Sequence, residues 1–263
     1  MGVEHIEEVP EFYYTELWSI GTHMCFRGPL LFHYTSPVLP HILYFLLQFC
    51  WSMASINAFT NPCYWIGYAT LTNFRPSNKL KSNPNGPQKV PEDRLLRFIG
   101  INLAGHICGD IIFTIFMFLT ARYPFPFAYL AIEKPDLPSG FHSFGSGFIG
   151  EMLQTGVVIY SSFFLSYLSS YPQLHSSLIG AAIGSMLVLV GTHWTGCHVN
   201  PAAVLAHAFV SIGIFWSWYD IKMIWFVYIA GPILGSMIAG AIVSHMLNTT
   251  DAVGEKSKKE KEL

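Results

Sequence analysis

The sequence predicts an all-α membrane protein with six transmembrane helices, two re-entrant half-helices and inverted three-helix repeats. Composition, charge placement and recurring motifs support this prediction. Of the 263 residues, 52% are hydrophobic and 11% are charged, and the mean hydropathy is +0.40. A soluble domain usually carries about 25% charged residues. No Asp, Glu, Lys or Arg occurs in residues 28–74, and only eight occur in residues 98–250. Long uncharged runs between short charged blocks are typical of a multi-spanning membrane protein.

The charges also exclude several classes of function. The net charge is only −2, so no basic surface is available for phosphate groups and no nucleic-acid partner is expected. The basic residues gather at 75–97 and 256–261, and the positive-inside tendency places both blocks on the cytoplasmic face. The five cysteines and eleven histidines match no zinc pattern, and no enzyme motif occurs. We therefore expect no metal, no cofactor and no enzymatic activity.

Each predicted span is an apolar run that can cross a bilayer core about 30 Å thick. The first run is weak because it contains Glu16, and the fifth is interrupted by small polar residues. The six runs are Phe12–Phe26, Pro37–Phe59, Phe98–Ala121, Gly147–Leu168, Leu174–Trp194 and Met223–Leu247. Two further apolar segments, Pro62–Phe74 and Pro201–Phe215, cover about half of the core at ~1.5 Å per residue. These two segments are predicted to be the half-helices.

Three motifs recur in the same order along the chain. Glu16 with Gly21 recurs as Glu151 with Gly156, Asn61-Pro62 recurs as Asn200-Pro201, and Ala104-Gly105-His106-Ile107-Cys108-Gly109 recurs as Ala230-Gly231-Pro232-Ile233-Leu234-Gly235. The chain then divides into a first repeat (1–120), a connecting loop (121–146), a second repeat (147–248) and a cytoplasmic tail (249–263). Because each repeat holds an odd number of spans, the second must cross the membrane upside down. Inverted repeats commonly place a site near the midplane.

The two Asn-Pro pairs are the strongest candidates for that site. Asn is a favoured N-cap and Pro is favoured at the first helical position, so Asn61 and Asn200 should each start a half-helix. The predicted half-helix starts are Pro62 and Cys63 in the first repeat and Pro201 and Ala202 in the second. Both positive dipole ends would then meet at the midplane, where they bind neutral polar solutes and repel cations.

These residues resemble the aquaporin, or major intrinsic protein, family across nearly the whole chain. The strongest match is Thr195-Gly196-Cys197-His198-Val199-Asn200-Pro201-Ala202, and Asn61-Pro62-Cys63 resembles the unorthodox super-aquaporin branch of the aquaporin-eleven type. The resemblance implies a passive channel for water and small neutral solutes, embedded in a lipid bilayer as a homotetramer. It also implies that Asn61 and Asn200 orient the solute. Glu16 and Glu151 match the family's paired glutamates, which hold the carbonyls of the two re-entrant loops.

The selectivity filter is where the chain departs from the family pattern. Aligned without gaps from Asn200, the filter arginine falls on Ala203, the filter histidine of strict water channels on Val188 and the mercurial-sensitive cysteine on Cys197. His41 or a neighbour would supply the first-repeat filter position. Loss of the arginine and the histidine predicts a wider, more apolar constriction that also admits glycerol or hydrogen peroxide.

Two alternatives to a channel remain open at this point. Bulky aromatic residues near the loops, Tyr64, Trp65 and Trp194, would suit a membrane scaffold that kept the fold without an open pore. Asp110 and Glu151 would suit an ion-coupled transporter, although Asp110 matches no family role.

The end of the chain bears on localisation. Lys259 and Lys261 resemble a dilysine signal for retrieval to the endoplasmic reticulum, and the alternative is an ordinary solvated charge run. We expect an intracellular membrane, with the plasma membrane as the other candidate.

Overall fold

The computed structural model describes residues 39–54, 60–76, 87, 89, 91–119, 144–191, 194–210, 222 and 224–262. Every regular element in these ranges is a helix, which confirms the predicted fold class. The helices are α2 (Leu39–Ala54), α3 (Pro62–Asn73), α5 (Glu92–Leu119), α7 (Phe144–Tyr167), α8 (Gln173–Gly191), α9 (Pro201–Val210), the π-helix η3 (Ile224–Ala230) and α11 (Gly231–Glu262). The first predicted span, with Glu16, lies outside the described residues.

Four helical stretches in the described part are long and apolar enough to cross a membrane. They are Glu92–Ile112, Phe144–Tyr167, Gln173–Gly191 and Ile224–Val253. Each corresponds to a predicted span. Helices α7 and α8 begin three residues and one residue before the predicted starts, and α5 and α11 exceed the predicted bounds by more. Helix α5 begins at Glu92 because acidic residues in a first turn interact favourably with the helix dipole. Helix α11 continues to Glu262, so the predicted tail begins as a helical extension of the last span.

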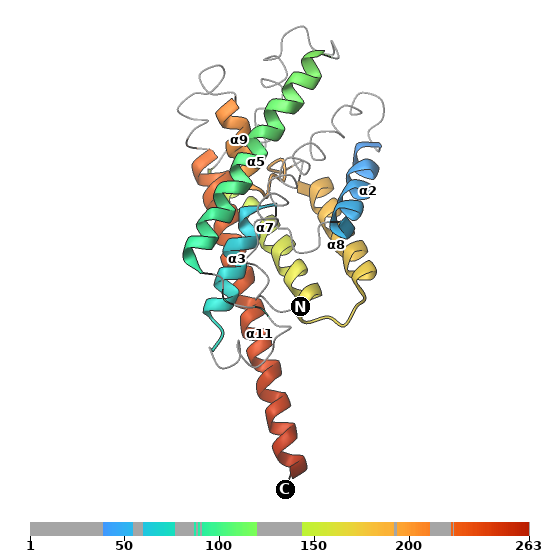
Figure 1. Cartoon of the computed structure of the whole chain (residues 1–263), viewed down its shortest axis with the longest axis vertical. Helices are drawn as coiled ribbons and strands as arrows, with labels where there is room; N and C mark the ends of the chain where they lie inside the picture. Colours follow the sequence, from blue (N-terminus) through green and yellow to red (C-terminus); the bar gives the residue numbers. More distant parts are fainter. Residues whose placement is uncertain are drawn as a thin grey trace.

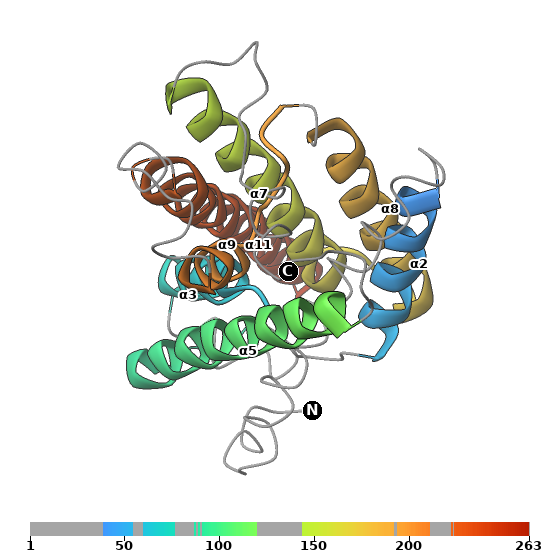
Figure 2. The same ribbon diagram turned by 90° about the horizontal axis from the view of Figure 1, so that it is seen from above.

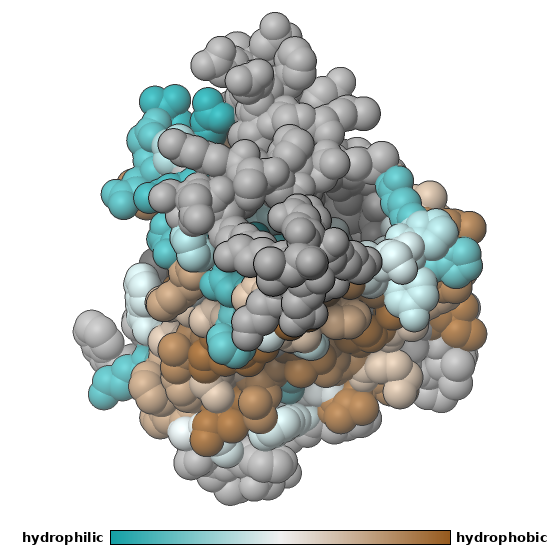
Figure 3. All heavy atoms as spheres, turned by 90° about the horizontal axis from the view of Figure 1, so that it is seen from below, coloured by the Kyte–Doolittle hydropathy of each residue, from teal (hydrophilic) through white to brown (hydrophobic). Residues whose placement is uncertain are grey.

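Apolar side chains on the outside of these helices fit a lipid environment. Helices α5, α7, α8 and α11 and the π-helix η3 each carry large exposed hydrophobic residues, and Figure 3 shows such residues gathered over the described surface of one face. A soluble protein rarely exposes apolar patches of this extent. Examples are Ile111, Ile115, Leu153, Val157, Val190, Trp225 and Ile242. The exposed apolar surface therefore supports the membrane interpretation drawn from composition.

The two half-helices meet end to end inside the bundle. Helix α3 runs from the middle of the molecule toward the end that carries the C-terminus, and α9 runs the opposite way (Figure 1). In the view from above they overlap between α5 and α11 (Figure 2), and the asparagine at the start of α3 contacts the residue before Asn200. Helix α3 packs on α11, while α9 packs on α5. Each half-helix thus packs against the third span of the other predicted repeat.

Glycines allow these helices to approach closely. A Cβ added to Gly235 of α11 would collide with the carbonyl of Met152 in α7, and one added to Gly240 would collide with the carbonyl of Gly67 in α3. In lipid the burial of apolar surface does not drive helices together, so they associate through close packing. Small residues allow that packing because they let the two backbones approach each other. The buried core between α3, α7 and α11 consists of Cys63, Tyr68, Leu71, Ile159, Phe163, Ala239 and Val243.

The last span changes its winding at Pro232. Residues Ile224–Ala230 form a π-helix, and α11 follows from Gly231. Proline has no N–H for the carbonyl four residues earlier, and its ring crowds that carbonyl in an α-helix. A wider turn before Pro232 accommodates the ring. It also turns the fully buried Tyr228 toward the second loop, where its hydroxyl donates to the Thr195 carbonyl at 2.9 Å.

The end of the first half-helix and the extension of α11 lie on the same side of the molecule. Arg75 Nη2 lies 2.8 Å from Asp251 Oδ2, and the Asn248 amide donates to the Phe74 carbonyl at 3.3 Å. The start of the first basic block therefore contacts the segment that leads to the second. This agrees with the prediction that both blocks face the same compartment.

Candidate functional site

Each half-helix begins at an asparagine whose side chain caps it. The Oδ1 atom of Asn61 accepts a hydrogen bond from the Cys63 N–H at 2.9 Å, with Pro62 at the first helical position. The Oδ1 atom of Asn200 accepts from Ala202 N–H at 3.0 Å and from Ala203 N–H at 3.4 Å. The caps place the amide nitrogen of each asparagine away from its own helix. They also fix which end of the amide is the oxygen, because only oxygen can accept.

The amide nitrogens then reach across to the opposite repeat. Asn61 Nδ2 donates to the Val199 carbonyl at 2.9 Å, and Asn200 Nδ2 lies 3.5 Å from the Thr60 carbonyl. Asn61 is 7% exposed and Asn200 is 9% exposed. The structure therefore brings together the two residues predicted to orient the solute, although 139 positions separate them in the sequence. Each asparagine contacts the residue that precedes the other.

Glu151 of α7 binds the second loop through N–H groups. Its Oε1 accepts from the Thr195 hydroxyl at 2.6 Å and from His198 N–H at 3.0 Å, and its Oε2 accepts from Val199 N–H at 2.9 Å. The sequence-based expectation that this residue holds carbonyls needs correction, because an ionised carboxylate can only accept. Binding the N–H groups turns the carbonyls of the same peptide units the other way. Glu151 is fully buried, so these bonds offset the cost of its charge.

The loop before Asn200 has an unusual backbone. Gly196, Cys197 and Val199 have φ angles of 88°, 52° and 42°. Glycine adopts this left-handed region freely, whereas a β-branched valine is strained there by about 1–3 kcal/mol. The hydrogen bonds to Glu151 hold the strained segment in place. This backbone directs the Val199 carbonyl to Asn61, whose amide donates to it.

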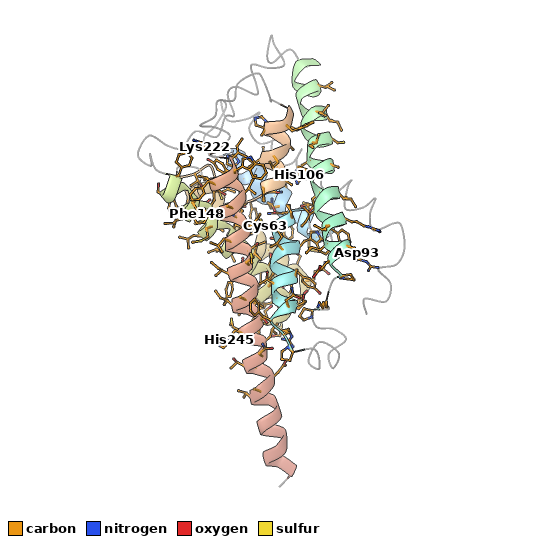
Figure 4. The ribbon with its side chains drawn as sticks, turned by 90° about the vertical axis from the view of Figure 1, so that its left-hand side faces the viewer. Cys63, Asp93, His106, Phe148, Lys222 and His245 are labelled. Atoms are coloured by element: carbon orange, nitrogen blue, oxygen red, sulfur yellow. The ribbon has the colours of Figure 1, made fainter. Side chains whose placement is uncertain are left out.

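His106 joins this centre from α5, and the sequence-based candidate list does not contain it. Its Nε2 lies 2.9 Å from the Thr60 carbonyl and 3.1 Å from Asn200 Nδ2. The side chain is 1% exposed, and Figure 4 shows it on α5 beside the region where the half-helices begin. Comparison of the two repeats could have identified this residue. His106 occupies the position that Pro232 occupies in the second repeat, so a polar side chain stands in one repeat where the other has proline.

Comparison with known proteins agrees with this arrangement. The family model described as major intrinsic protein matches residues 87–243, more than half of the chain. The chain belongs to the major intrinsic protein family. Members of this family are membrane channels for water and small solutes, not enzymes. No curated protein matches the chain.

A solved structure shows the same fold as this major intrinsic protein. The X-ray structure of the aquaglyceroporin from Plasmodium falciparum superposes with a TM-score of 0.68, over 90% of this chain and 95% of that one. Sequence identity is 16%, so the likeness concerns the fold.

The four positions predicted for the family's filter differ in how far their side chains are buried. Ala203 is the third residue of α9 and is partly buried, as is Val188 on α8. Cys197 is 1% exposed and lies against Gly191 of α8, so it does not line an open passage. His41 lies in α2, and its side chain falls outside the described residues. Ala203 and Val188 therefore remain the filter candidates that the structure describes.

Asp110, which the family resemblance left without a role, contacts the second half-helix. Its Oδ2 lies 3.4 Å from Nδ1 of His207 on α9, and the two side chains are 0% and 6% exposed. A charge buried in a membrane protein requires such a partner. Asp110 and His106 are four residues apart and so lie on one face of α5. That face contacts α9 at both its start and its far end.

Two of the aromatic residues that suggested a scaffold lie in helix contacts. Trp65 stacks on Phe98 of α5 with ring centroids 4.0 Å apart, and the Tyr64 hydroxyl lies 3.0 Å from the Ser162 hydroxyl of α7. Trp194 lies beside Gly150 of α7. The contacts of α3 with α5 and α7 account for the packing of Tyr64 and Trp65.

Proposed function

We propose that the protein is a passive channel for water and small neutral solutes, with Asn61 and Asn200 as its solute-orienting residues. The observation that carries this proposal is the meeting of two half-helix starts, each capped by the Oδ1 of its asparagine. Two positive dipole ends at one point favour a solute oxygen and oppose cations, protons included. The amide N–H groups supply the matching hydrogen-bond donors.

The proposed filter is wide and apolar, so glycerol or hydrogen peroxide would pass as well as water. The support is the small methyl group of Ala203 and the apolar Val188 at the positions of the family's arginine and histidine. Neither side chain offers a hydrogen bond or a charge. A filter of this kind selects by width more than by polarity.

Glu151 is proposed to hold the second loop open to the solute, and Glu16 to do the same for the first loop. The three hydrogen bonds of Glu151 to Thr195, His198 and Val199 support its part. An ion-coupled transport role would require a carboxylate that gains and loses protons. The use of Glu151 as a fixed acceptor argues for the channel.

Several finer assignments are part of the same proposal. The repeats cover 1–120 and 147–248, joined by the loop 121–146 and followed by the tail 249–263. Cys63 supports membership of the super-aquaporin branch, and Lys259 and Lys261 support residence in the endoplasmic reticulum. A homotetramer would follow the family pattern.

Osmotic shrinkage of proteoliposomes tests the channel proposal. The wild-type protein should accelerate the flux of water or glycerol above that of empty liposomes. Asn200→Asp keeps an oxygen for the cap but removes the amide donor and adds a negative charge, so it should lower the flux severalfold. Gly100→Ala is the control, because its added Cβ meets nothing within 4 Å. Wild-type flux equal to that of empty liposomes for water, glycerol and peroxide would refute the channel and favour a scaffold.

The filter assignment has its own test. Ala203→Arg should narrow the constriction and add a charge, so glycerol flux should fall at least about threefold more than water flux, corresponding to at least about 0.6 kcal/mol of discrimination. The ratio of the two permeabilities in proteoliposomes measures this. Equal loss of both fluxes would show that residue 203 lies away from the constriction.

A further inference from the structure

We propose that His106 is a positioning residue of the solute-orienting centre. Its Nε2–H binds the Thr60 carbonyl, and this leaves both N–H groups of Asn200, instead of one, available to the passing solute. The inference rests on the proposed channel function and concerns how the Asn200 amide is oriented at its central site.

The first observation is an asymmetry between the two asparagines. In related inverted halves, each amide should donate to the carbonyl that precedes the other asparagine. Asn61 does so at 2.9 Å, with Val199 as acceptor. Asn200 lies 3.5 Å from the equivalent carbonyl of Thr60, at the outer limit of a hydrogen bond. The Thr60 carbonyl is therefore not held mainly by Asn200.

His106 explains the asymmetry. Its Nε2 lies 2.9 Å from the Thr60 carbonyl, closer than Asn200 does. The corresponding position in the second repeat is Pro232, whose side chain has no donor. No equivalent group therefore competes with Asn61 for Val199. The difference between the halves follows from one residue type at one repeat position.

The contacts also decide where the imidazole proton lies. A carbonyl can only accept, so a short contact with Thr60 requires a proton on Nε2. Without that proton, lone pairs of Nε2 and the carbonyl would face each other at 2.9 Å. The amide of Asn200 cannot turn to offer its oxygen, because Oδ1 binds Ala202 N–H at 3.0 Å. With Nε2 protonated, the 3.1 Å approach of Asn200 Nδ2 is a contact between two donors and not a hydrogen bond, and the Thr60 carbonyl has the closer donor in His106.

The tautomer is measurable directly. Solid-state ¹⁵N NMR of the full-length protein in bilayers, labelled at histidine, distinguishes a protonated from an unprotonated Nε2. The His106 signals are assigned by their absence from His106→Gln. We expect Nε2 protonated and Nδ1 unprotonated at neutral pH. A bare Nε2 would overturn the proposal. This result does not depend on whether the protein conducts.

Flux measurements test the consequence. His106→Leu removes the donor, so the Asn200 amide should move to the Thr60 carbonyl and the flux per folded channel should fall about fivefold, the equivalent of one hydrogen bond. His106→Gln can donate to Thr60 from its own amide and should recover most of that loss. Cys108→Leu, on the exposed side of the same helix, is the control for an added apolar side chain.

The outcomes separate the two proposals. Wild-type flux at the level of empty liposomes would refute the channel function, while the NMR result would still decide the hydrogen bond. A conducting wild type with equal flux in His106→Leu, or no recovery in His106→Gln, would overturn the positioning role alone. If the leucine variant does not fold, the tautomer decides the proposal.

Discussion

Glu151 illustrates how a single side chain sets the shape of the second loop. Its carboxylate accepts from Thr195, His198 and Val199, and these bonds hold a backbone that includes two non-glycine residues with positive φ. A buried charge alone would be costly, and strained residues alone would relax. Together they hold a loop whose Val199 carbonyl meets Asn61 of the first repeat.

Glu151→Gln should therefore destabilise the protein by about 1–3 kcal/mol, because the new amide nitrogen would face a loop N–H and leave it without an acceptor. Thermal unfolding in detergent, followed by tryptophan fluorescence, measures the shift in Tm. Ser161→Ala is the control on the same helix, since that hydroxyl bonds only to carbonyls of its own helix, at 2.7 Å to Val157. A Tm equal to that of the wild type would contradict the role of Glu151.

The polar face of α5 is the second feature at this scale. Asn102, His106 and Asp110 are spaced four residues apart, and all are at most 1% exposed. His106 contacts the start of the second half-helix, and Asp110 contacts its far end through His207. The sequence marks Asp110 as an intramembrane carboxylate. It does not reveal the partner, because His207 lies almost a hundred positions away.

At the scale of elements, the half-helices depend on caps and on close packing. The Asn-Pro pairs start α3 and α9, and glycines let α11 approach both α3 and α7. The crossing of α7 and α11 is especially tight, because Gly235 faces the carbonyl of Met152 and the backbone of Gly156. Backbone atoms cannot move aside as a flexible side chain can, so this crossing tolerates no added atom.

Gly235→Ala should accordingly lower stability by about 1–3 kcal/mol, the usual cost of overpacking. Gly184→Ala on α8 is the matched control, because its added Cβ meets nothing within 4 Å and alanine favours helix. The Tm of each variant in detergent distinguishes them. If both substitutions behave alike, the α7–α11 crossing is looser than described.

At the scale of the whole molecule, the two repeats hold each other together. Helix α3 packs mainly on α11 and α9 mainly on α5, so each half-helix takes most of its support from the third span of the other repeat. The ion pair of Arg75 with Asp251 adds a link between the first half-helix and the extension of the last span. The extension of α11 is therefore tied to the end of the first half-helix.

Loss of either partner of the Arg75–Asp251 ion pair should lower stability by a different amount. The Arg75 side chain is 4% exposed, and that of Asp251 is 36% exposed. Asp251→Ala leaves a buried cation unpaired and should cost about 1–3 kcal/mol. Arg75→Met keeps the aliphatic stem and leaves a carboxylate that water can reach, so it should cost less. Unfolding midpoints of the two variants and the double variant measure this, and the reverse order would contradict the buried-cation argument.

Much of this architecture is readable from the sequence for a physical reason. Lipid imposes long apolar runs on spans, and Asn-Pro is a local cap signal, so the spans after the first and both half-helix starts were predicted close to their described bounds. The ends differ where charged residues extend a helix, at Glu92 and beyond Leu247. Apolar runs mark where lipid is, not where helical hydrogen bonding stops.

The sequence by itself determined the all-α fold, the repeat order and the two asparagines, because each depends on local chemistry repeated along the chain. Only the tertiary structure decided that Glu151 binds N–H groups, that Cys197 is buried, that Asp110 meets His207 and that His106 enters the centre. The contacts of Glu151, Asp110 and His106 join residues more than forty positions apart. Their geometry follows from how the inverted halves interlock, and no local pattern encodes it.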